Sequence, residues 1–189
     1  MRANPIGIAV RSGAVYYTDT YDKASELEHV VRVPLPAGPA QIVSSTVGAW
    51  MVAVDDQGAY WTDPASDAVW TAPTSGGEAA MMASILEPHD IEVDSDAVYV
   101  TGLEGTFRIP LAGGAPQKLV SGAGLGLAID ATHVFVGAAD GRLLRVPKSG
   151  GAAVVLARAD LYPGDIAVND QYVFWIVRSI TGALMRTPK

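Results

Sequence analysis

The chain of 189 residues contains no cysteine. Disulfides, thiol catalysis and thiolate metal sites are therefore excluded. Positive charge is scarce too, since 13 Lys and Arg face 20 Asp and Glu, which leaves a formal charge of −7. Phosphate binding needs clustered basic side chains, and a span across a bilayer needs an apolar run of about 20 residues. The sequence has neither, so we expect no nucleic-acid partner and no membrane partner.

A secretory signal pattern is also missing from the first residues, MRANPIGIAVRSG. Residues 8–10 already read as the first strand of a repeat. The sequence leaves two alternatives for the compartment: a cytoplasmic protein, or a mature or shortened form that lacks its export signal.

What the chain does have is a repeated phrase. Five aromatic segments follow short apolar strands and polar turns: VYYTD (15–19), AYWTD (59–63), VYVTG (98–102), VFVGA (134–138) and VFWIV (173–177). Each is followed by a strand that ends in proline, and these prolines lie 39, 37, 37 and 41 residues apart: Pro34, Pro73, Pro110, Pro147 and Pro188.

A period of about forty residues built only of strands is typical of a β-propeller, with one repeat in each blade. We therefore predict an all-β chain with four-stranded antiparallel blades and a single propeller domain over residues 1–189. The repeats cover approximately residues 6–46, 50–86, 89–122, 125–158 and 164–189. Gly-Gly pairs predict tight turns between the third and fourth strands.

Most of the recurring polar and aromatic residues are interpreted as structural. An Asp or Asn ends the first strand in four repeats, where such side chains favour turns: Asp55, Asp94, Asp130 and Asn169. Trp61 and Trp175 hold equivalent places, which indicates packing between sheets. The arginines two residues before the prolines are expected to bond neighbouring strands.

The run of residues 59–63 contains YWTD, and the wider pattern adds an IAVD-like strand and an RVP-containing strand followed by Gly-Gly. This pattern resembles the YWTD repeats of low-density-lipoprotein-receptor-type propellers, and still more the related bacterial repeat proteins of unknown function. The resemblance implies a propeller, a structural role for Asp19 and Asp63, and an extracytoplasmic parent. The receptor propellers have six blades, whereas five repeats are visible here, and the motif decays along the chain.

Closure of the ring is the main structural question that the repeats raise. The fifth repeat lacks its own fourth strand, because residues 184–188 form its third. Residues 1–5 would have to supply the missing strand. Three alternatives follow: a closed or nearly closed five-blade array, which we favour, a fragment of a larger propeller, or two chains paired through exposed edges.

Candidate site residues come from the loops that gather at one end of a propeller axis. His89 and Asp90 precede one first strand, and Asp165 occupies the position of Asp90 in the fifth repeat. His29 follows a long acidic loop over residues 20–28. We predict these four as ligand-binding candidates, with Asp90 and Asp165 as candidate metal ligands. Oxygen ligands of this kind suit Ca²⁺.

No catalytic residues are assigned, because no nucleophile, zinc or nucleotide motif appears. The sequence therefore favours a non-enzymatic binding module without a cofactor, present as a monomer or an edge-paired homodimer. Its ligand would be a protein or a small molecule. The alternatives are a metal-dependent lyase or lactonase with its site at the axial mouth, and a fragment of a larger propeller.

Overall fold

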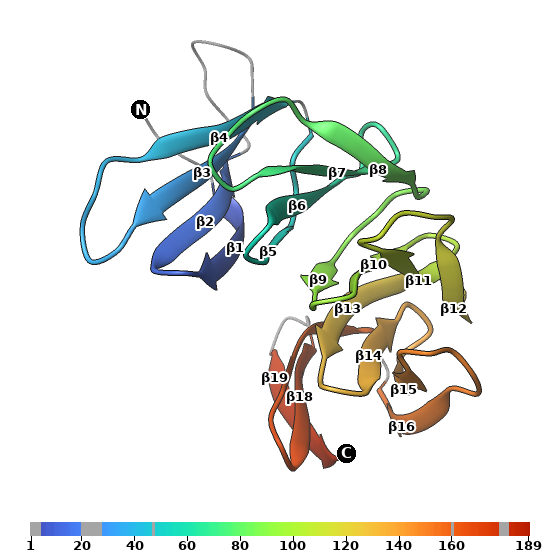
Figure 1. The fold of residues 1–189 in the computed structure, drawn as a ribbon. Coiled ribbons are helices and arrows are strands. Elements are labelled where there is room, and N and C mark those ends of the chain that lie inside the picture. Colours follow the sequence, from blue (N-terminus) through green and yellow to red (C-terminus); the bar gives the residue numbers. More distant parts are fainter. Residues whose placement is uncertain (1–4, 20–27, 47, 160, 178–181) are drawn as a thin grey trace. The chain divides into compact units, whose positions relative to one another are not determined.

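The computed structural model describes residues 5–19, 28–46, 48–159, 161–177 and 182–189. These residues form strands and turns without a helix, arranged as five antiparallel sheets (Figure 1). In every sheet, strands that follow one another along the chain are also hydrogen-bonded neighbours. The described residues accordingly contain no helix that could span a membrane.

The first two sheets have four strands each. Sheet 1 consists of β1 (Pro5–Arg11), β2 (Ala14–Asp19), β3 (Glu28–Pro34) and β4 (Gln41–Thr46). Sheet 2 consists of β5 (Val52–Val54), β6 (Gly58–Asp63), β7 (Ala68–Pro73) and β8 (Ala80–Ser84).

The remaining sheets repeat the pattern, and only the last differs in strand number. Sheet 3 consists of β9 (Ile91–Val93), β10 (Ala97–Gly102), β11 (Gly105–Pro110) and β12 (Gln117–Ser121). Sheet 4 consists of β13 (Gly124–Ile129), β14 (His133–Ala138), β15 (Arg142–Pro147) and β16 (Val154–Arg158). Sheet 5 has only β17 (Pro163–Val168), β18 (Tyr172–Val177) and β19 (Ala183–Pro188).

The turns confirm the interpretation of the recurrent Asp and Asn. In sheet 2, Asp55 Oδ1 accepts hydrogen bonds from the backbone N–H groups of Gln57 and Gly58, both at 2.8 Å. Asp94, Asp130 and Asn169 do the same two and three residues ahead. A short polar side chain thus closes the turn between the first two strands in sheets 2 to 5.

The threonine of the YWTD motif joins neighbouring sheets. Thr18 and Thr62 are completely buried. The Thr62 hydroxyl accepts a hydrogen bond from Met51 N–H and donates one to the carbonyl of His89, each at 3.1 Å. Thr18 does the same with Gly7 and Trp50. The hydroxyl therefore links its own first strand to the segment that leads into the next sheet.

The described chain divides into two compact units, residues 1–98 and 99–189, and the boundary falls inside β10. In the first unit, Tyr16 and Val30 of sheet 1 pack with Val52, Val54 and Trp61 of sheet 2. In the second unit, Phe135 and Leu143 of sheet 4 pack with residues of sheet 5, among them Ile166, Val168, Val173 and Trp175. Burial of Trp61 and Trp175 confirms their predicted packing role.

Three expectations lie outside what the structure tests. Most of the predicted acidic loop, residues 20–27, and most of the segment proposed to complete the fifth repeat, residues 1–4, fall outside the described residues. A single domain over residues 1–189 likewise stays a prediction, because the two units are described separately.

Candidate functional site

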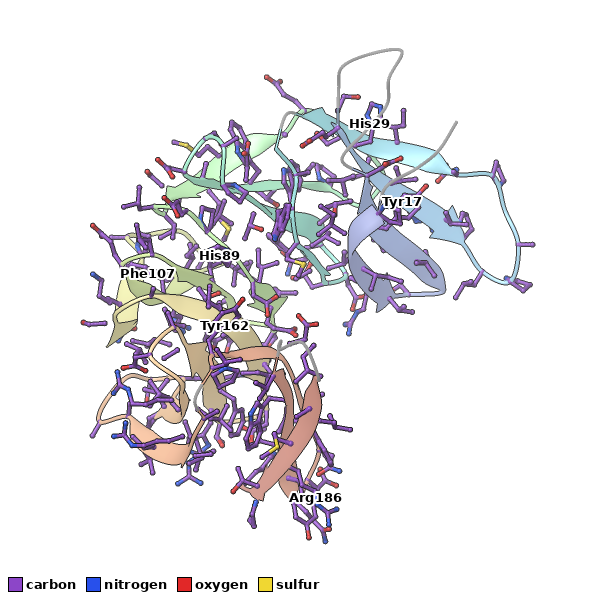
Figure 2. The ribbon with its side chains drawn as sticks, turned by 180° about the vertical axis from the view of Figure 1, so that it is seen from behind. Tyr17, His29, His89, Phe107, Tyr162 and Arg186 are labelled. Atoms are coloured by element: carbon purple, nitrogen blue, oxygen red, sulfur yellow. The ribbon has the colours of Figure 1, made fainter. Side chains whose placement is uncertain are left out.

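Large aliphatic side chains are exposed on one face of sheet 1. Ile8 is 71% exposed and Val10 is 66% exposed. They lie opposite Tyr17 and Val15 in the β1–β2 register, so the four side chains share one face. We call Ile8, Val10, Val15 and Tyr17 the first face; Tyr17 is labelled in Figure 2.

Sheet 5 has a comparable face. Leu184 is 74% exposed and pairs with Ile176, while Phe174 pairs with Ala167 on one side and Arg186 on the other. We call Ala167, Phe174, Ile176 and Leu184 the last face. Arg186 lies over the ring of Tyr172, 4.9 Å from its centroid, and the rings of Tyr172 and Phe174 are 6.1 Å apart. This side of sheet 5 is therefore apolar and aromatic, with one cation.

A polar site lies at the start of β3. Glu28 is half-buried, and its carboxylate accepts a hydrogen bond from Gly48 N–H. Burial raises the pKa of Glu28, the hydrogen bonds from the backbone of Gly48 and Ala49 oppose this, and the charges of Asp63 and Asp19 add to the rise. The sequence placed Glu28 at the end of an acidic loop, whereas the structure places it half-buried at the start of β3.

His29, which follows Glu28, lies opposite Asp19 and Ser45 in the sheet register. Its Nδ1 atom is buried and has no hydrogen-bond partner within the described chain. Asp63, the last residue of the YWTD run, accepts hydrogen bonds from the backbone of Ala65 and Ser66 at 3.0 and 3.1 Å. Asp63 thus holds the turn that follows its own strand.

The predicted residues at the axial mouth belong to separate units. His89 and Asp90 are half-buried just before β9; Asp90 Oδ1 accepts a hydrogen bond from Ile91 N–H at 2.9 Å. Asp165 is exposed in β17. Figure 2 labels His29 and His89, which lie in different parts of the first unit. Their use as ligands stays a prediction, and within the described residues no three His, Asp or Glu side chains form a group suited to a metal ion.

A shallow hollow of about 210 Å³ lies where the turns after β1, β5 and β9 approach one another. Its polar lining includes Arg11, Asp55, Asp56 and Asp94. Arg11 donates to both carboxylate oxygens of Asp56, at 3.0 and 2.8 Å, and Ser12 donates a third hydrogen bond at 2.6 Å. These contacts lower the pKa of Asp56 to about 2. The hollow is thus lined by side chains that already tie sheet 1 to sheet 2.

No protein-family model and no curated protein matches the sequence. The fold does match solved structures. A chain in the crystal structure of a nidogen/laminin complex is 18% identical, with a TM-score of 0.82 over 98% of this chain and 76% of that one. A gluconolactonase from Xanthomonas campestris is 14% identical, with a TM-score of 0.74 over 99% and 73%. The computationally designed Ika8 protein is 13% identical, with a TM-score of 0.67 over 98% and 71%.

These similarities and the five antiparallel sheets confirm the predicted fold class: the chain is all-β and has a β-propeller fold, with each sheet as one blade. The sequence identities are too low to carry more than the fold, which hosts many unrelated functions.

Proposed function

We propose that this chain is a propeller interaction module that binds a protein through its first and last faces. The observation that carries the proposal is the exposure of Ile8, Val10 and Leu184, at 71%, 66% and 74%. Contiguous exposed apolar side chains are typical of protein-binding surfaces. Each face combines these aliphatic groups with an aromatic side chain, Tyr17 or Phe174, of the type enriched in interfaces.

Two further considerations support a binding role. A similar fold occurs in the nidogen/laminin complex, where proteins associate. We also infer that the repeats are of the YWTD type, because the buried Thr18 and Thr62 join neighbouring blades in the same way. The resemblance of these repeats to receptor-type and bacterial propeller repeats fits a module whose ligand is a protein.

Site-specific photo-crosslinking in the producing cell tests the proposal. A benzophenone amino acid is placed at position 8 or 184, and the control carries it at position 103, where Leu103 is 43% exposed outside both faces. We expect protein adducts from positions 8 and 184 that the control does not form. Adducts no more abundant than those of the control would refute the proposal.

A second candidate is a metal-dependent lactonase with its site near His89, Asp90 and Asp165. The observation that favours it is the fold similarity to a gluconolactonase. A cation that binds only the folded protein must raise its melting temperature. If the chain is such an enzyme, Ca²⁺ or Mn²⁺ should raise its melting temperature. EDTA should reverse this rise, and Asp90→Asn should remove it. An unchanged melting temperature would reject it.

A further inference from the structure

We propose that the partner of each face is the opposite face of a second copy of this chain. This inference rests on the binding role proposed above. One copy would place its first face on the last face of another, so that the contact repeats the packing between neighbouring blades.

The first unit shows what normally covers the first face. Val52, Val54 and Trp61 of sheet 2 occupy the repeat positions of Ile8, Val10 and Tyr17, because each set has the same pairing between the first two strands. The sheet 2 residues are buried against Tyr16 and Val30 of sheet 1. Val52 is 6% exposed and Val54 is 9% exposed, whereas Ile8 and Val10 remain largely exposed. Among the described residues of the first unit, no sheet covers the first face as sheet 1 covers its equivalents in sheet 2.

The second unit shows what normally covers the last face. Phe135 and Leu143 of sheet 4 occupy the positions of Phe174 and Leu184. Both are completely buried in the cluster that contains Ile166, Val168 and Trp175 of sheet 5. Leu184 is 74% exposed instead. Among the described residues of the second unit, no sheet covers Leu184 as sheet 5 covers Leu143.

The side chains that cover the equivalent of the last face in sheet 4 have counterparts on the first face. Ile166, Val168 and Trp175 cover Leu143 in sheet 4, and their equivalents in sheet 1 are Ile8, Val10 and Tyr17. A second copy thus presents to Leu184 the same kinds of side chain in the same register. A contact of this type is heterologous, because two different surfaces of identical chains meet.

The absence of cysteine allows a clean crosslinking test. The variants Ile8→Cys and Leu184→Cys are purified separately, mixed, and treated with a short bis-maleimide. The control mixture replaces Ile8→Cys with Ser95→Cys, an exposed turn position outside both faces. We expect a product of twice the chain mass, at roughly tenfold or more the control yield, because docked thiols meet at an effective concentration near the millimolar range.

Substitution at the faces provides the independent check. In chains that keep the parent's other residues, Leu184→Glu should abolish the association that sedimentation measures, and Leu103→Glu should leave it intact. Because Leu184 is exposed, the glutamate variant should retain the circular dichroism spectrum of the parent. If the mixture of Ile8→Cys and Leu184→Cys gives no more crosslinked product than the control mixture, self-association is overturned. If photo-crosslinks at positions 8 and 184 then reach a different protein, the binding role stands and only the identity of the partner falls.

Discussion

The Asp130 carboxylate has two structural roles, and substitutions can separate them. Its Oδ1 atom accepts hydrogen bonds from the N–H groups of Thr132 and His133, at 2.9 and 2.8 Å, and so closes the turn after β13. Its Oδ2 atom accepts one from Lys189 Nζ at 2.8 Å. The carboxylate thus ties sheet 4 to the end of sheet 5.

The lowered pKa of Asp130 gives the size of its contribution to the free energy of unfolding. Burial raises this pKa, but the hydrogen bond from Lys189 and those from the turn outweigh the effect and lower it from 3.8 to about 2. At about 1.4 kcal/mol for each pKa unit, the ionised carboxylate contributes about 2 kcal/mol to the free energy of unfolding at neutral pH. A depressed folded-state pKa means that this stability is present above pH 3.8 and is lost as the pH falls through about 2.

The repeat itself supplies the matched variant. Asn169 closes the equivalent turn of sheet 5 with the same two backbone hydrogen bonds. Asp130→Asn should therefore keep the turn and lose only the charge, at a cost of about 1 kcal/mol, whereas Asp130→Ala should cost about 2 to 3 kcal/mol. Urea unfolding at neutral pH measures both, and repetition toward pH 2 should shrink the gap between the parent and Asp130→Asn. Equal costs for the two variants, or a gap independent of pH, would refute this division of roles.

Three further predictions concern close packing and charge. Gly126→Ala should lower the free energy of unfolding by about 2 kcal/mol or more in urea, because its Cβ would lie 2.0 Å from the Gly164 carbonyl oxygen in the next sheet; an unchanged midpoint would show that β13 and β17 can separate. Asp56→Asn should have a small effect on thermal stability that fades in high salt, since the Arg11–Asp56 pair is exposed; a large, salt-independent loss would contradict this. The raised folded-state pKa of Glu28 favours the folded state at low pH, so the stability of the parent should decline as pH rises through and above 4.5. Glu28→Gln should flatten this decline, and a parent that shows no decline would be inconsistent with the burial of Glu28.

The strands and turns could be predicted from sequence because their signals are local and repeated. The alternation in VYYTD and AYWTD places successive side chains on opposite faces. Asp55 and Asn169 act on backbone groups two and three residues ahead, so neighbouring residues carry the whole signal. The role of Thr18 and Thr62 as links between sheets was missed, although their recurrence in the motif was the available sign.

The candidate surfaces could not be predicted in this way. Ile8 and Val52 have the same place in the repeat and similar side chains, yet one is exposed and the other is buried. Val52 packs against sheet 1, whereas no described sheet of the first unit buries Ile8, and no local pattern encodes this difference. The hydrogen-bond partner of Glu28 is likewise Gly48, a residue beyond the neighbouring strand β4. The grouping of His89 and Asp90 with Asp165 remains a prediction from repeat register alone.

Sedimentation velocity over a range of protein concentrations is the most direct test of binding between the first face of one copy and the last face of another. The parent chain and Leu103→Glu should both form a species larger than the monomer as concentration rises, and Leu184→Glu should remain monomeric. A parent chain that sediments as a monomer throughout, or a Leu184→Glu variant that associates as the parent does, would contradict the proposed self-association through these faces.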